Sequence, residues 1–197
     1  MTKIILASQS PRRQELLTEM GVVFDVMPSN FDEQLDDARE PADVAEELAV
    51  GKAMAIAKEF PSAIVIGADT IVTINGKQLE KPTSPENAVE LLTLLAGKTH
   101  EVTTGLAVIC LDEGIHLVDS DTTKVTFKPY DEKAIRAYVA TGDPMDKAGA
   151  YGIQSPSAAA LIAGYEGNLD TVVGLTTSNL AEMLSMIGIY ASPIDAV

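Results

Sequence analysis

The chain has 197 residues, 46% of them apolar, and a formal net charge of −15 at pH 7. This length and apolar fraction are typical of a globular protein with one substantial core, and they exclude a disordered chain. The negative charge argues against DNA, RNA or an anionic membrane as a partner. A phosphate ligand would also be repelled unless basic side chains gather locally or a divalent cation assists, so the positions of the 14 Lys and Arg residues are informative.

Features that would place the chain in a membrane or an oxidising compartment are missing from the sequence. No apolar run is long enough to span a bilayer, and the apolar patch near the N-terminus is too short for a signal peptide. Cys110 is the only cysteine, so no internal disulfide can form. His100 and His116 lie far apart and make no metal-ligand pattern. We therefore expect a cytoplasmic protein with no membrane or nucleic-acid partner.

The first part of the chain predicts alternating strands and helices. The patterns of apolar residues predict strands over 3–7, 22–27 and 63–74 and helices over 11–20 and 42–59. Asn75-Gly76 is the strongest short hairpin signal and predicts that "KQLEKP" returns as a partner strand.

The second part continues this alternation. Ser84-Pro85 predicts the start of a helix, and Gly97 lies past its end. The later predicted elements are strands over 101–110, 116–128, 158–163 and 170–175, a helix over 131–140 and a last helix that starts at Asn179. The whole pattern predicts an α/β fold with a mixed, twisted sheet flanked by helices.

The segment "LASQSPRRQELL" (6–17) carries two arginines in an unusual place. Ser10 and Pro11 predict a helix start, where partial positive charge favours Asp or Glu rather than Arg12 and Arg13. One arginine there is typical of a solvated face. Two arginines directly after a strand and a Ser-x-Ser turn favour an anion site, but the Walker A and G-x-G-x-x-G patterns are absent. The segment therefore predicts a phosphate site of another kind.

Asp69 interrupts the otherwise apolar strand over 63–74. A buried carboxylate needs a partner, so the residue is either part of a structural ion pair or a metal ligand or general base. If the hairpin register continues outward, Glu80 pairs with Ile71 and lies diagonal to Asp69, while Lys81 pairs with Thr70. Two carboxylates and a lysine would then meet at one strand end, and the carboxylates suit Mg²⁺, which prefers oxygen ligands and bridges to substrate phosphates.

Three further positions carry weaker signals. Asp32 and Glu33 lie in a polar loop, where solvated side chains are the simpler interpretation. Lys52 interrupts a run of small apolar residues and either extends its ammonium group to solvent or points into a cleft. The segment "DKAGAYGIQ" (146–154) is either a surface loop or a ligand loop in which Gln154 offers a donor and an acceptor to a base edge.

Four segments, "ASQSPRRQELL", "GADTIV", "LEKP" and "DKAGAYGIQ", resemble in order and spacing the Maf proteins, a family of nucleoside triphosphate pyrophosphatases. The resemblance covers about residues 3–190. "ADT" with "DKAGAYGIQ" resembles the branch that hydrolyses dTTP and UTP rather than the branch acting on methylated GTP. The resemblance implies a single domain over 1–197, with two lobes around a deep cleft as in the inosine triphosphate pyrophosphatases. It also implies a divalent cation (Mg²⁺ or Mn²⁺), a cytoplasmic location and a homodimer.

The resemblance also implies roles for individual residues. Asp69 matches the proton acceptor of the family. The positions that determine substrate specificity match Arg12, Thr70 and Gln154. Further active-site positions match Ser8, Arg13, Glu33, Lys52 and Lys81. The chain departs from the family at two places: Ser155-Pro156 follow Gln154 where Gly is usual, and Thr176 stands where Pro is usual.

The residue chemistry and the resemblance together predict one reaction. The cations that would hold the triphosphate are Arg12, Arg13, Lys52 and Lys81, and the acids that would hold the metal are Glu33, Asp69 and Glu80. Asp69, or a water that it orients, would deliver the nucleophile to the α-phosphorus, giving a nucleoside monophosphate and pyrophosphate. Two alternatives stay open: a pyrophosphatase for modified purine triphosphates, and a nucleotide-binding regulator of cell division and septum formation.

Overall fold

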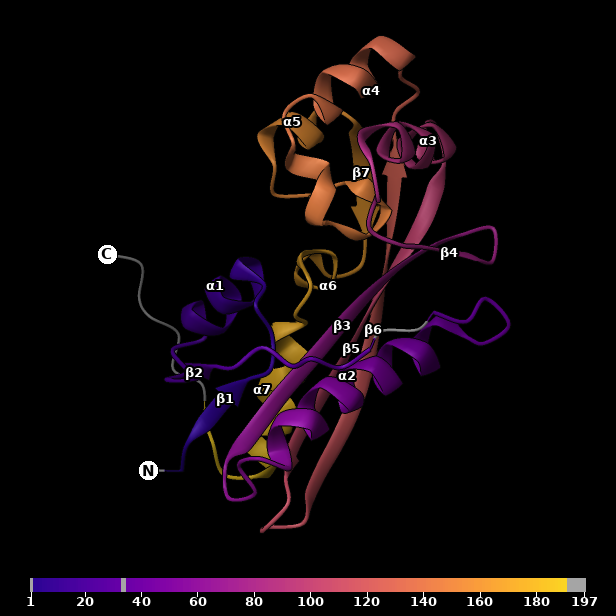
Figure 1. Ribbon diagram of the computed structural model, residues 1–197. Coiled ribbons are helices and arrows are strands. Elements are labelled where there is room, and N and C mark those ends of the chain that lie inside the picture. The colour runs from indigo at the N-terminus through magenta and orange to yellow at the C-terminus, as the bar shows by residue number, and fades with distance from the viewer. Residues whose placement is uncertain (1, 33–34, 191–197) are drawn as a thin grey trace.

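The structure, a computed structural model, describes residues 2–32 and 35–190 (Figure 1). Its strands form one mixed sheet in the order β2-β1-β3-β5-β6-β7, with β4 paired to β3. β1 is parallel to β2 and β3, and the other pairs are antiparallel. The strands are β1 (Ile4–Leu6), β2 (Asp25–Val26), β3 (Ile64–Ile74), β4 (Lys77–Leu79), β5 (Thr99–Cys110), β6 (Ile115–Phe127) and β7 (Ile162–Glu166). The prediction of a mixed α/β fold is confirmed.

Helices cover both faces of the long strands β3 and β5. The helices are α1 (Pro11–Glu19), α2 (Pro41–Ala57), α3 (Pro85–Leu95), α4 (Glu132–Val139), α5 (Pro156–Ala159), α6 (Leu169–Val173) and α7 (Thr177–Met186), with short 3₁₀ helices η1 (Asp143–Asp146) and η2 (Ala148–Ala150). Alternate strand residues face opposite ways. Val65 and Ala107 therefore pack against α2, whereas Ile66 and Leu106 pack against α1 and α7.

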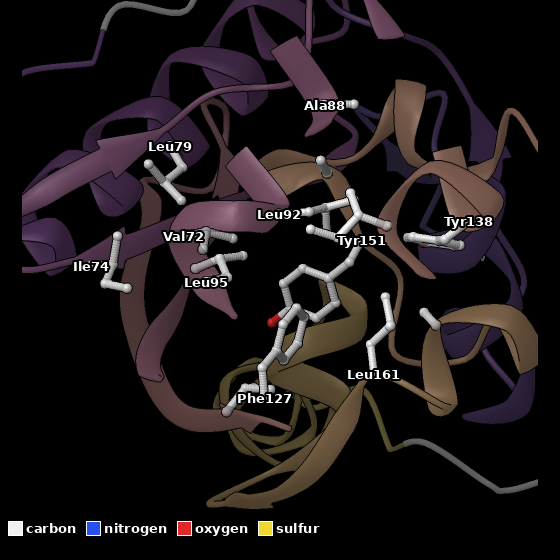
Figure 2. Close-up of a cluster of buried hydrophobic side chains, with 14 of the residues drawn as sticks. Val72, Ile74, Leu79, Ala88, Leu92, Leu95, Phe127, Tyr138, Tyr151 and Leu161 are labelled. Atoms are coloured by element: carbon white, nitrogen blue, oxygen red, sulfur yellow. The ribbon is translucent and has the colours of Figure 1, made fainter. Parts of the chain in front are cut away.

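A separate apolar cluster fills the other end of the long strands, where α3, α4, α5 and β7 gather (Figure 1). Figure 2 shows Phe127 of β6 and Tyr151 together in this cluster, with Leu92 and Leu95 of α3 beside them. The rings of Phe127 and Tyr151 meet edge to face, with centroids 4.8 Å apart. Tyr151 belongs to the segment 146–154, so this core anchors the loop that carries Gln154.

Two glycines let α2 lie unusually close to the sheet. A Cβ at Gly67 of β3 would lie 2.3 Å from the carbonyl oxygen of Ala49, and one at Gly105 of β5 would lie 2.3 Å from Ala45. Any side chain at either position would therefore push the helix away. The close approach brings Lys52, on the next turn of α2, over the strand that carries Asp69.

The predicted elements up to residue 140 are present, with β2 reduced to two residues and the return strand β4 to three. The predicted strand over 170–175 is wrong, because the Asn168 side chain caps the start of helix α6 and Gly174 ends it with a positive φ of 119°. The predicted strand over 158–163 is displaced to β7, and residues before it form α5. The last helix starts at Thr177 rather than at Asn179, whose amide instead donates to Asp119.

Candidate active site

A cleft of about 810 Å³ lies where segments from distant parts of the chain meet. It is lined by residues 7–13, 28–30, 69–72, 79–81, 146–148, 151–154 and 172–173, with Leu35, Lys52 and Val102. Its size is that of a small-molecule site. Five cations and three carboxylates lie among the described lining residues: Arg12, Arg13, Lys52, Lys81 and Lys147, with Asp69, Glu80 and Asp146. The local surplus of positive charge reverses the sign of the whole chain, which has 14 basic and 29 acidic residues.

Lys52 and Asp69 form a buried ion pair in this cleft. Lys52 Nζ donates to Asp69 Oδ1, and each side chain is only 9% exposed. Lys52 therefore points inward, which decides between the two interpretations of this residue. Asp69 has the partner that a buried carboxylate requires, and the pair also lies where a ligand can reach it.

Arg13 is fixed by contacts on three sides. Its Nε donates to the carbonyl oxygen of Gly174 at 2.7 Å, Nη2 donates to Thr70 Oγ1 at 3.1 Å, and Nη1 donates to Ser8 Oγ at 3.3 Å. The Ser8 hydroxyl also accepts the backbone N–H of Ser10 at 3.2 Å. The first turn of α1 and the end of β1 therefore orient one guanidinium group beside Thr70, the neighbour of Asp69.

Thr70 also takes part in a series of hydrogen bonds that leads away from Arg13. Thr104 Oγ1 donates its hydrogen to the carbonyl oxygen of Thr171 at 2.7 Å. The contact of 2.9 Å between Thr70 Oγ1 and Thr104 Oγ1 must then have Thr70 as donor, since Thr104 has no second hydrogen to give. These hydrogen bonds form a relay in which each group donates to the next: Arg13 to Thr70, Thr70 to Thr104, and Thr104 to the carbonyl oxygen of Thr171. Thr104 is not among the residues predicted from the sequence, because nothing distinguishes it there from any other β-branched strand residue.

Arg12 points to a different partner from Arg13. Its Nη1 lies 3.3 Å from Asp146 Oδ2 of η1, and Asp146 Oδ1 accepts from Lys147 Nζ at 2.6 Å. Lys147 also pairs with Asp143 at 3.0 Å, and Asp143 accepts from the hydroxyl of Tyr138 at 2.6 Å. Burial raises the pKa of Asp146, but hydrogen bonds and charge from Lys147 and Arg12 outweigh it, so this pKa lies below its ordinary value.

The predicted β3–β4 hairpin has the expected register but ends earlier. Ile74 pairs with Lys77, and the ladder stops at the pair Val72–Leu79. The expected pairing of Glu80 with Ile71 and of Lys81 with Thr70 is not part of this ladder, because the Glu80 carbonyl accepts the N–H of Gly149 at 3.2 Å instead. Glu80 and Lys81 nevertheless line the cleft with Asp69, from a chain segment that turns toward η2.

The remaining predicted positions divide into two groups. Gln154 is exposed and lines the cleft, and the neighbouring Ser155 hydroxyl lies 2.8 Å from that of Ser157. Glu33 lies outside the described residues. In the part of the chain that the structure describes, no three His, Cys, Asp or Glu side chains gather closely enough to hold a metal ion. Mg²⁺ commonly takes only one or two carboxylates and completes its shell with substrate phosphates and water, and two of the predicted ligands, Asp69 and Glu80, line the cleft.

The described helices include none that is long and apolar enough to cross a membrane. The family described as Maf-like protein matches residues 3–187 of this chain. The chain belongs to this family.

Three relatives are similar to this Maf-like chain over nearly its full length. Proteins named dTTP/UTP pyrophosphatase from Moorella thermoacetica and Symbiobacterium thermophilum are 46% and 47% identical, covering 96% and 95% of this chain and 97% and 95% of their own length. A protein of the same name from Bacillus cereus is 44% identical over 96% of this chain and 97% of its own. The solved structure of the Staphylococcus aureus Ham1 protein aligns with a TM-score of 0.48 at 18% identity, over 64% of this chain and 72% of that chain.

Proposed function

We propose that this Maf-like chain is a nucleoside triphosphate pyrophosphatase that hydrolyses dTTP and UTP to the nucleoside monophosphate and pyrophosphate. The observation that carries the proposal is the cleft itself, in which a strongly acidic chain gathers four cations in addition to the buried Lys52–Asp69 pair. Such a charge reversal suits a polyanionic ligand of nucleotide size. The names of the relatives at 44–47% identity agree with this substrate class.

The phosphates are assigned to the end of the cleft around Arg13. Arg13 presents a planar guanidinium group that Ser8, Thr70 and Gly174 hold in place, and such groups bind phosphate oxygens in pairs. Lys81 is exposed at the same cleft and adds a point charge. These two cations stabilise the negative charge that develops on the leaving pyrophosphate.

A divalent cation, Mg²⁺ or Mn²⁺, is assigned to Asp69 and Glu80, and Glu33 is proposed as a further ligand. When bound, such an ion neutralises phosphate charge and lowers the pKa of a coordinated water. Lys52 balances the charge of Asp69 and fixes its orientation in the wall of the cleft.

Asp69 is proposed as the group that accepts the proton of the attacking water. The water oxygen forms a bond to the α-phosphorus while its proton passes to the carboxylate. The bond between the α-phosphorus and the oxygen bridging to the β-phosphorus breaks, and its electron pair leaves with pyrophosphate. Because Arg13 already contacts Thr70, the residue after Asp69, phosphate binding and proton transfer take place at adjacent positions of β3.

A pyrophosphate-release assay tests this function, with dTTP, UTP, inosine triphosphate and methylated GTP, each with and without Mg²⁺. We expect metal-dependent release that is fastest with dTTP and UTP. Equal or faster release from the purine nucleotides would assign the chain to modified purines instead. Tight nucleotide binding with no release from any nucleotide would support a regulatory protein.

Three further proposals accompany this function. The chain is proposed to be a single domain of two lobes on either side of the cleft, cytoplasmic, and a homodimer. Light scattering coupled to size-exclusion chromatography measures the mass in solution, and a mass near the 20.8 kDa of one chain contradicts the dimer.

A further inference from the structure

The short helix α6 lies between α1 and the long strands β5 and β6, and it forms part of the wall of the cleft (Figure 1). Two backbone carbonyl oxygens of this segment support the phosphate end of the cleft. That of Gly174, just past the helix, accepts from Arg13 Nε at 2.7 Å, and that of Thr171 accepts from Thr104 at 2.7 Å. The position of α6 therefore determines where both acceptors lie.

Gly174 brings the backbone of this segment into close contact with Arg13 and Thr70. Its φ is 119°, a value that favours glycine, and a Cβ there would lie 3.2 Å from Thr70 Oγ1 and 3.4 Å from Arg13 Nε. Because the backbone lies this close to both side chains, a small displacement of α6 also displaces the guanidinium group.

Two side chains of β6 hold α6 in place. Asp121 and Thr123 are alternate residues of this strand, so they face the same way. Thr123 Oγ1 donates to the carbonyl oxygen of Asn168, the N-cap of α6, and accepts the N–H of the same residue, both at 2.8 Å. Asp121 Oδ2 accepts from the hydroxyl of Thr171 in the middle of the helix. A helix of five residues buries little surface of its own, so its position depends strongly on such hydrogen bonds.

The direction of the hydrogen bonds at Thr171 makes Asp121 the final acceptor. An ionised carboxylate only accepts, so the Thr171 hydroxyl gives its single hydrogen to Asp121. The contact of 3.0 Å between the hydroxyls of Thr171 and Thr176 then has Thr176 as donor. Both threonines are fully buried, and a buried hydroxyl that loses its partner is costly. Removal of the carboxylate would therefore force α6 to rearrange.

We propose that Asp121 is a positioning residue for Arg13: it holds Thr171 and thereby fixes α6, so that the Gly174 carbonyl oxygen keeps the guanidinium group directed at the phosphates. This inference rests on the proposed function, which assigns the phosphates to Arg13. Asp121 lies outside the described lining of the cleft, so it acts through α6 and not by contact with the substrate. A hydrogen bond to an ionised acceptor is stronger than one between neutral groups, which suits this role.

Isothermal titration with pyrophosphate in the presence of Mg²⁺ tests the inference, because it measures the phosphate end of the cleft without a base and without turnover. Asp121→Ala should raise the Kd for pyrophosphate by about fivefold or more. Asp121→Asn should stay within about twofold of the wild type, since its amide oxygen still accepts from Thr171. Asp119→Ala is the matched control: Asp119 lies on the same face of β6 but accepts from Asn179 of α7 at 2.9 Å, and its loss should leave the Kd unchanged.

Two further variants keep the test decisive if Asp121→Ala does not fold. Thr171→Val keeps the volume of the side chain but removes the donor to Asp121, so it should raise the Kd as much as Asp121→Ala does. In an Arg13→Ala background, Thr171→Val should add less than about a twofold change, because the group that α6 positions is gone.

Three results would overturn the inference. A wild-type Kd for pyrophosphate in folded Asp121→Ala or Thr171→Val would remove the role of Asp121 and leave the pyrophosphatase function standing. An equal rise of the Kd in Asp119→Ala would assign the effect to a general loosening of β6. A wild-type protein that neither binds pyrophosphate nor hydrolyses any nucleotide would reject the proposed function and this inference with it.

Discussion

Lys52 of α2 and Asp69 of β3 meet as a buried ion pair because the sheet beneath the helix carries no side chain at Gly67 and Gly105. The helix can approach the strands to backbone contact only at such positions. The ion pair in the cleft thus depends on two glycines that carry no functional group. Removing one member of a buried pair is strongly destabilising, so the pair contributes to function and also constrains the fold.

Asp69→Asn should separate nucleotide binding from hydrolysis. The amide keeps the shape of the side chain, and its oxygen can still accept from Lys52 Nζ, but it cannot take a proton from water. A positioned general base contributes about 10²–10⁴-fold in rate. We expect nucleotide affinity within about tenfold of wild type, or roughly 1.4 kcal/mol, and the loss of nearly all pyrophosphate release. Isothermal titration and a release assay measure the two quantities. Wild-type turnover in this variant would make Asp69 a structural residue only.

Gly105→Ala should damage the active site from a distance. The new Cβ would lie 2.3 Å from the backbone of Ala45, so α2 must move and carry Lys52 away from Asp69. Overpacking of this kind costs about 1–3 kcal/mol, and we expect lower stability to urea together with reduced turnover. Gly164→Ala on β7 is the matched control, because a Cβ there meets nothing within 4 Å. Similar losses in both variants would contradict this account of α2.

The sequence predicted the segments of the active site better than it predicted the contacts between them. The spacing of apolar residues and the Asn75-Gly76 hairpin signal located the first strands and helices. Asp69 was recognised because a carboxylate in an apolar strand needs a partner or a function. The partner of Asp69 could not be found, since Lys52 pairs with it only through the glycine contacts between α2 and the sheet.

Two elements show why the remaining predictions failed. The run over 170–175 contains three consecutive β-branched residues, yet Asn168 caps a helix over Leu169–Val173. The hairpin register predicts Glu80 on the ladder, but its carbonyl bonds to Gly149, nearly seventy residues later in the sequence. Both outcomes depend on one side chain or one tertiary hydrogen bond, and such individual contacts override local propensity.

Thr104→Val should loosen Arg13 without changing the shape of the core. Valine fills the same volume but cannot accept from Thr70 or donate to Thr171, so the relay from Arg13 is broken. We expect a KM for nucleotide that rises severalfold, along with a stability loss of about 1–3 kcal/mol from the unpaired carbonyl. Steady-state kinetics and urea denaturation measure these effects.

The neighbouring Thr103→Val provides the control for this prediction. Thr103 is also buried in β5, but its hydroxyl pairs with that of Thr122 at 2.8 Å and has no link to Arg13. This variant should lose stability while keeping the wild-type KM. A KM that rises equally in both variants would show that the effect comes from the strand and not from the relay.

His100 should make the stability of the protein depend on pH. Its Nε2 lies 2.7 Å from the Tyr151 hydroxyl, and burial lowers the pKa of His100 from 6.5 to about 4. The unfolded chain therefore binds a proton that the folded chain excludes between these values. The stabilisation is complete above pH 6.5 and is lost as the pH falls toward 4, by on the order of 3 kcal/mol. Urea denaturation at pH 4.5, 5.5 and 7 measures this loss of stability.

Two histidine variants test whether His100 is the cause. His100→Gln should flatten the dependence of stability on pH, whereas substitution of the exposed His116 should leave it unchanged. If stability still falls with pH in His100→Gln as it does in the wild type, the effect belongs to other groups.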